Sequence, residues 1–158
     1  DVEEEMKGLA AEGAALRKEL IDSIQKDTES FTAYMNALGM PKNTDEEKAA
    51  RKEAMQNGLK EAAEVPLAVA ETALKIFHVA GAVVERGNAN AVTDGLVASM
   101  MARTAVLSAL LNVKINLGSI KDEEFVARMA AKVAELEKAA MDGEKAVMEL
   151  SALTRDLV

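Results

Sequence analysis

The chain contains no cysteine and a single histidine, His78. Without cysteine it can form no disulfide, no thiolate nucleophile and no zinc–thiolate site. Transition metals in proteins usually need several histidine or cysteine ligands, so we expect no metal centre. His78 lies in the apolar stretch LKIFHVAG, where a packed or edge histidine is the simpler interpretation. Any acid–base chemistry must then come from Asp, Glu, Lys or Tyr side chains.

Aromatic residues, prolines and positive charge are also scarce. Aromatics make up 3% of the 158 residues and there are two prolines, against thirty alanines, a composition that favours an all-α protein. The net charge of −8 argues against nucleic acid as a partner. No uninterrupted apolar run reaches the ~18 residues of a membrane span, and no basic leader with an apolar core is present. We therefore expect no membrane association and a cytoplasmic location.

Apolar residues recur at intervals of three and four, which predicts four to five long helices in one antiparallel array. The first helix would be about 55 Å long, more than a compact monomer of this size spans, so we expect a homodimer. Pro66 is expected to kink the second helix or to start a new one. The expected helices cover 2–38, 44–64, 66–86, 91–117 and 123–157.

Asp27 breaks the apolar pattern of the first helix. It lies between Ile24 and Phe31 on the stripe that we expect to be buried. A carboxylate there needs a partner or a raised pKa. Two interpretations stay open: a capping or salt-bridging group where helices cross, or an acid–base group. In an antiparallel array Asp27 stands at a height similar to that of Asn112.

Asn112 and Asn116 lie one turn apart on the same face of the third long helix. Two amides on one face can hydrogen-bond a flat heterocycle or satisfy a neighbouring helix. Asp94, about 27 Å from Asn112 along the helix axis, belongs with Asn88 and Asn90 in the preceding loop. Asp94 is either a residue that favours the helix dipole or a functional residue supplied by an antiparallel partner subunit.

These residues, in order and spacing, resemble the cyclodeaminase/cyclohydrolase family. This family comprises the C-terminal domain of formiminotransferase-cyclodeaminase and its free-standing bacterial relatives. The stretches that carry the resemblance are DTESFTAYMNALGMPKNTDEEKAARKEAMQNGLKEAAEVPLAVAET, RGNANAVTDG and LLNVKINLGSIKDEEF. The resemblance implies an all-α dimeric fold and a tetrahydrofolate derivative as substrate, with no cofactor. Family members carry a preceding Pro-Gly-Gly-Gly-type turn that nothing here matches, so we expect one helical domain, residues 1–158, without that segment.

Two reactions are implied. Members convert 5-formiminotetrahydrofolate to 5,10-methenyltetrahydrofolate and ammonia, and relatives hydrolyse the methenyl form to 10-formyltetrahydrofolate. Both pass through a tetrahedral carbon and need proton transfer, for which Asp27 and Asp94 are the candidates. A fused or associated formiminotransferase is a candidate partner. The alternative from another class is a non-catalytic dimeric helical bundle that acts as an interaction protein, which does not explain Asp27 or the two amides. The candidate substrate-binding residues are Lys42, Asn43, Arg51, Asn88, Asn90, Asn112 and Asn116.

The stretch 38–51, LGMPKNTDEEKAAR, joins the first two helices. Thr44 and Glu47 predict a capping box at the start of the second helix. Lys42, Asn43 and Arg51 can hold folate carboxylates or the pterin edge, because an acidic protein needs a local positive patch to bind an anionic substrate. The other interpretation is a solvated loop, with Arg51 paired to an acid on a neighbouring helix.

Overall fold

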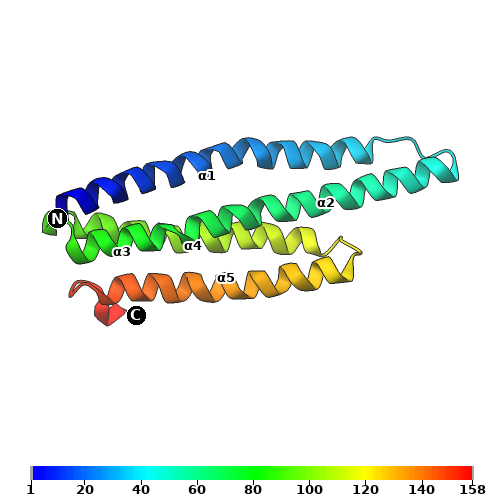
Figure 1. Cartoon of the computed structure of the whole chain (residues 1–158). Coiled ribbons are helices and arrows are strands. Elements are labelled where there is room, and N and C mark those ends of the chain that lie inside the picture. The colour runs from blue at the N-terminus through cyan, green and yellow to red at the C-terminus, as the bar shows by residue number, and fades with distance from the viewer. Residues whose placement is uncertain (1, 158) are drawn as a thin grey trace.

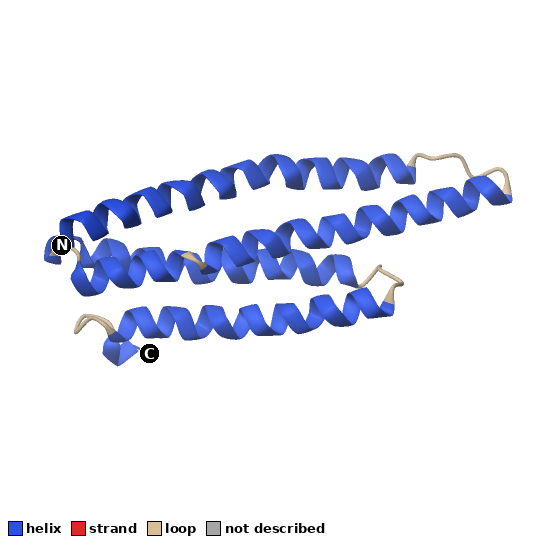
Figure 2. Cartoon of the chain, viewed as in Figure 1, coloured by secondary structure: helices blue, strands red, loops and turns tan. Residues whose placement is uncertain are grey.

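The structure, a computed structural model, describes residues 2–157 and contains four long helices and one short one in that range (Figure 1). Loops and turns join them, and the described residues contain no strand (Figure 2). The predicted all-α antiparallel array is confirmed. The helices are α1 (Val2–Leu38), α2 (Asp45–Leu74), α3 (Ile76–Arg86), α4 (Val92–Leu117) and α5 (Glu123–Glu149), with short 3-10 turns at Ala89–Ala91 and Arg155–Leu157.

The two central helices are α2 and α4, which pack against each other. Helix α1 covers one side of α2, and α5 covers one side of α4 (Figure 1). Among the described residues, α1 and α4 do not pack on each other, because α2 separates them. This order leaves a trough between α1 and α4 whose floor is α2.

The core consists mainly of small and branched residues of the two central helices. Val106, Leu110 and Val113 of α4 are fully buried, and so are Ala63 and the other core alanines of α2. Alanine at the contact lets the two helices approach closely. This close contact fixes the spacing between α2 and α4.

Side-chain caps are present at the starts of two helices, and the one at α2 is the capping box that the sequence predicts. The Thr44 hydroxyl accepts a hydrogen bond from Glu47 N at 3.2 Å, and the Glu47 carboxylate accepts one from Thr44 N at 3.3 Å, which completes the capping box. Asp122 caps α5 by accepting a hydrogen bond from Phe125 N at 3.0 Å. Its hydrogen bond with Lys60 Nζ at 2.6 Å, together with that cap, lowers the pKa of the Asp122 carboxyl.

The interpretation that Pro66 starts a new helix is wrong, and so is the predicted end of the last helix. Helix α2 continues through Pro66, and the break with α3 lies at Lys75. The last helix ends at Glu149 rather than near 157. There Thr154 Oγ1 donates to Met148 O at 2.8 Å and Ser151 Oγ accepts from Leu153 N at 3.2 Å. Such side-chain bonds to the backbone compete with helix continuation.

The predicted buried stripe of α1 is also wrong over its middle. Ile24 is 67% exposed and Phe31 is 62% exposed, while Leu9 and Leu16 nearer the N-terminus are buried. The exposed section of α1 borders the trough, where no other described helix covers it. Its apolar residues are therefore available to a ligand or to another chain.

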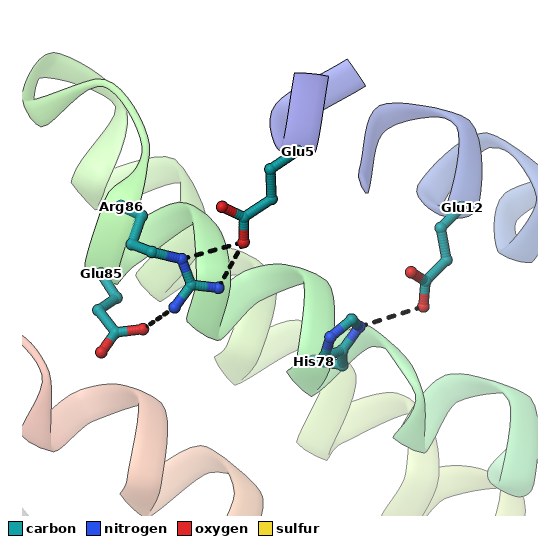
Figure 3. Close-up of polar contacts among 5 residues, drawn as sticks. All are labelled: Glu5, Glu12, His78, Glu85 and Arg86. Atoms are coloured by element: carbon teal, nitrogen blue, oxygen red, sulfur yellow. Dashed lines mark hydrogen bonds and ion pairs between the residues drawn. The ribbon is translucent and has the colours of Figure 1, made fainter. Parts of the chain in front are cut away.

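The N-terminal half of α1 contacts α3 through an Arg86–Glu5 ion pair and a His78–Glu12 hydrogen bond. Figure 3 shows Arg86 between Glu5 and Glu85, with Arg86 Nη2 2.7 Å from Glu5 Oε1. On the same helix as Arg86, His78 Nδ1 lies 3.3 Å from Glu12 Oε1 of α1 (Figure 3). His78 is thus an exposed edge histidine facing α1, remote from the trough.

By length and composition alone, two stretches are apolar enough to cross a membrane: Asp45–Arg86 and Ala89–Leu117. In each, 39% of the most apolar window is buried inside the chain. Core helices of water-soluble proteins have the same length and composition, so this is weak evidence for a membrane span. The absence of a membrane partner stays a prediction.

Candidate functional site

A groove of about 400 Å³ occupies the trough between α1 and α4. Its walls are mostly apolar and carry a few polar groups, which is typical of small-molecule sites. Helix α2 forms its floor, and the two rims come from α1 and α4, which each run antiparallel to α2 and so parallel to each other (Figure 1). The lining residues are Leu20, Ser23, Ile24, Asp27 and Thr28 from α1, Pro66 and Val69 from α2, and Ala105, Ser108, Ala109 and Asn112 from α4.

Asp27 stands on the α1 rim of this groove. Its carboxylate forms no ion pair or hydrogen bond with any residue in the described range, 2–157, and is exposed. The expectation that Asp27 is buried within the chain is therefore wrong, because nothing covers this section of α1. At the same level the buried residue is Ser30, whose hydroxyl donates to Asp27 O at 2.9 Å. The carboxylate is left free to act on a ligand.

Asn112 stands on the opposite rim, on α4. Its Nδ2 donates to Ser108 O at 3.2 Å, so the amide is steadied along its own helix. Ser108 lies beside it in the groove. The structure thus brings Asp27 and Asn112 to one groove, as the antiparallel array predicts. The roles of the two residues stay predictions.

Asn116, predicted as a second substrate amide, is engaged in helix packing instead. Its Nδ2 donates to Ala62 O of α2 at 2.9 Å and to Asn112 O at 3.0 Å. The interpretation that one amide satisfies a neighbouring helix, which the sequence left open, holds for this residue. Sequence reasoning missed Pro66 as part of the groove floor. The only signal in the sequence is the proline itself inside a helical pattern, and the Asn116 bond to Ala62 O appears only in the structure.

The loop between α1 and α2 lies beyond one end of the groove. Arg51 donates from Nε and Nη2 to Leu38 O, at 3.3 and 3.1 Å, and so holds the C-terminal carbonyl of α1. Asn43 N donates to the Glu47 carboxylate at 2.7 Å. Lys42 is exposed and has no ion-pair partner in the described part of the chain. Leu38 is about 16 Å from Asp27 along α1, at 1.5 Å per residue.

Asn88, Asn90 and Asp94 lie at the opposite end of the array, where α3 turns into α4 (Figure 1). The Asn88 carboxamide oxygen accepts a hydrogen bond from Asn90 N at 2.9 Å and caps the short turn. Asp94 is exposed in the first turn of α4, where a carboxylate favours the helix dipole. Within one chain the structure does not bring these three residues to the groove.

Large apolar side chains are exposed on both helices that form the rims of the groove. On α1 these are Ile21, Ile24, Phe31 and Met35, which are 48–67% exposed. On α4 they are Val97, Met101, Leu111 and Ile115, which are 55–75% exposed. Exposed apolar surface of this kind is typical of a binding or association face. Across residues 2–157, no group of three or more His, Asp or Glu side chains is placed to hold a metal ion.

Comparison with known proteins relates the chain to one protein family. The sequence model of the formiminotransferase-cyclodeaminase family matches residues 1–135. A methenyltetrahydrofolate cyclohydrolase from Methylorubrum extorquens is 41% identical over 125 residues, which cover 79% of this chain. A formimidoyltransferase-cyclodeaminase from Gallus gallus is 36% identical over 132 residues, or 84% of this chain.

The fold is shared with a solved relative. The crystal structure of formiminotetrahydrofolate cyclodeaminase from Thermotoga maritima superposes with a TM-score of 0.83 at 29% sequence identity, over 99% of this chain and 73% of that one. The chain spans 60% of the length of the Methylorubrum relative and 24% of the length of the Gallus relative.

Proposed function

The chain belongs to the formiminotransferase-cyclodeaminase family, and we propose that its groove is the site of a folate cyclodeaminase that converts 5-formiminotetrahydrofolate to 5,10-methenyltetrahydrofolate and ammonia. One observation carries the proposal. The unpartnered carboxylate of Asp27 lines the same groove as Asn112, which stands on the opposite rim. A proton-transfer group and an amide that orients a heterocycle are what this reaction requires.

In the proposed reaction N10 of the folate attacks the carbon of the protonated N5-formimino group, –CH=NH2+, whose nitrogen becomes an amino group. Asp27 accepts the proton that N10 loses as the N10–carbon bond forms. It then gives this proton to the amino nitrogen, whose bond to carbon breaks as ammonia leaves. The two reacting groups belong to one substrate, so the protein mainly has to fix its conformation and move the proton. Asn112 and Ser108 orient the ring system, and the apolar groove walls hold its faces.

Methenyltetrahydrofolate cyclohydrolase is the second candidate, favoured by the 41% identity to the Methylorubrum enzyme of that name. In that reaction water attacks the bridging carbon and gives its proton to Asp27. The proton passes to N5 as the carbon–N5 bond breaks, and the hydroxyl on the same carbon releases its own proton to solvent, which leaves the formyl group on N10. The same carboxylate serves both reactions, which differ in the nucleophile and in the leaving nitrogen.

The assembly that we propose is a homodimer formed over the apolar rims of the groove, in which Asp94 reaches the site only from the partner subunit. Lys42 extends the site toward the glutamate carboxylates of the substrate. Asn88 and Asn90, in the loop before Asp94, would reach the site together with it from the partner subunit and contact the substrate. No cofactor is needed for either reaction, and the location we propose is cytoplasmic. Fusion to a formiminotransferase, as the name of the Gallus relative describes for that protein, is the proposed association with a second activity.

One pair of assays tests the function. Ammonia release from 5-formiminotetrahydrofolate and hydrolysis of 5,10-methenyltetrahydrofolate are measured side by side with the purified chain, against the uncatalysed rates. We expect ammonia release to exceed its uncatalysed rate by at least about 10³-fold, a modest acceleration for an enzyme. Hydrolysis without ammonia release would assign the cyclohydrolase. Absence of both activities and of folate binding would favour the rival function, a helical bundle that acts only as an interaction protein.

A further inference from the structure

Pro66 places an irregularity in the backbone at the floor of the groove. It lies inside α2, is buried, and lines the groove beside Val69. Proline has no amide hydrogen, so the carbonyl four residues earlier, that of Ala62, has no helical donor. A carbonyl in the interior of a helical array needs another partner.

The side chain of Asn116 supplies that partner from α4. Its Nδ2 donates to Ala62 O at 2.9 Å and to Asn112 O at 3.0 Å. A carboxamide nitrogen carries two hydrogens, so both are used in these bonds. Asn116 Nδ2 therefore has no hydrogen left to donate to a ligand.

The same bonds connect the floor of the groove to its α4 rim. Asn116 bonds the backbone of Asn112, and Asn112 Nδ2 bonds Ser108 O at 3.2 Å. Both Asn112 and Ser108 line the groove, while Asn116 does not. A continuous series of hydrogen bonds thus runs from Ala62 on α2 to the rim residues of α4.

We propose that Asn116 is a positioning residue that replaces the amide hydrogen missing at Pro66 and thereby fixes the Asn112 rim against the α2 floor. This proposal rests on the proposed function, because it assigns Asn116 a part in shaping the folate groove. It differs from a direct substrate contact in one testable respect. The need for Asn116 should vanish when residue 66 can again donate a hydrogen bond to Ala62 O.

A double-mutant cycle with Asn116→Ala and Pro66→Ala tests this dependence. With proline at position 66 we expect Asn116→Ala to lower the melting temperature by several degrees and to raise KM for the folate substrate about tenfold. The kcat should stay within about threefold, because the proton-transfer group is untouched. In the Pro66→Ala background the same substitution should change neither the melting temperature nor KM appreciably, because the amide of residue 66 now donates a hydrogen bond to Ala62 O. The comparison within each background removes the general gain in helix stability that Pro66→Ala brings.

Asn112→Ala is the matched control for the melting measurements, because its carboxamide bonds only within α4. Its effect on the melting temperature should be the same with and without the Pro66→Ala substitution. Equal losses from Asn116→Ala in both backgrounds would overturn the proposal and favour a direct ligand contact. If melting shows the expected coupling but no folate reaction is found, the role of Asn116 in the α2–α4 linkage stands and the proposed function fails.

Discussion

Asp27 and Asn112 face the groove from helices that do not pack on each other, so the distance between them is set by α2. Each rim residue therefore depends on contacts that lie outside the groove. Asn112 depends on the Asn116 bonds to α2, and Asp27 depends on the packing of α1 over α2. Substitutions that loosen either contact should raise KM without touching the reacting atoms.

Lys42 and Arg51 should separate into a binding role and a stability role. Lys42→Ala is expected to weaken binding of a folate that carries glutamate carboxylates and to leave stability unchanged. The loss of affinity should be smaller at high salt and for a folate without the glutamate tail. Arg51→Ala is expected to lower the free energy of unfolding by about 1–3 kcal/mol, because Leu38 O loses two charged donors. Folate titration calorimetry and urea unfolding of both variants measure the two effects.

The two variants serve as controls for each other. If Arg51→Ala kept its full stability and lost folate affinity, the guanidinium would be a ligand-binding group after all. If Lys42→Ala bound the full substrate as tightly as the unmodified chain, the loop would be a solvated connector only.

Single residues could be predicted where they broke a pattern. Asp27 and Asn112 were recognisable because a carboxylate and amides interrupt apolar faces, and the structure places both in one groove. The partners of Asn116 and Arg51 could not be predicted, because both side chains bond a backbone carbonyl of another helix, and the sequence does not show which helices lie side by side. The exposure of Asp27 was missed because periodicity shows which face is apolar without showing what covers it.

At the level of helices, the approach of α1 to α2 depends on Gly58. A Cβ atom added there would lie 3.0 Å from Tyr34 Cα and 3.2 Å from Tyr34 Cβ, so backbone as well as side chain would have to move. Gly8, also inside a helix, has nothing within 4 Å of its added Cβ. Of these two glycines, only Gly58 is therefore required by packing.

Gly58→Ala should destabilise the chain by about 1–3 kcal/mol through overpacking between α1 and α2. Gly8→Ala should stabilise it by about 0.5–1 kcal/mol, because alanine is the better helix former at an unconstrained position. Urea unfolding of both variants gives the two free energies. A stabilising Gly58→Ala would mean that α1 does not approach α2 as closely as the structure shows.

Helix existence and order could be predicted, and two boundaries could not. The caps at Thr44 and Asp122 have local signatures that a sequence displays directly. Helix α2 continues through Pro66, and Asn116, far along the chain on α4, bonds the carbonyl that the proline leaves without a helical donor. The early end of α5 depends on hydrogen bonds that Ser151 and Thr154 make with nearby backbone, which compete with a pattern still typical of a helix.

For the whole molecule, the apolar rims of the trough predict a two-fold homodimer. Helices α1 and α4 expose large apolar side chains, and exposed apolar surface is typical of an association face. A dimer over this face would also bring in Asp94 of the partner subunit. Sedimentation velocity at micromolar concentration should give twice the chain mass, and Leu111→Lys with Ile115→Lys should shift the chain to monomer by placing charge in the interface. A monomer mass for the unmodified chain would contradict the prediction.

Turnover by Asp27→Asn is the measurement that bears most directly on the proposed catalytic groove. Asparagine keeps the shape of the side chain and cannot shuttle a proton, so the variant should fold, bind folate and lose at least about 10²-fold in kcat for the reaction that the chain catalyses. Asp22→Asn is the control, because Asp22 lies on the same helix, pairs with Lys18 and does not line the groove. It should keep normal kcat. Near-normal turnover by Asp27→Asn would contradict the assignment of Asp27 as the acid–base group and would leave Asp94 of a partner subunit as the remaining candidate.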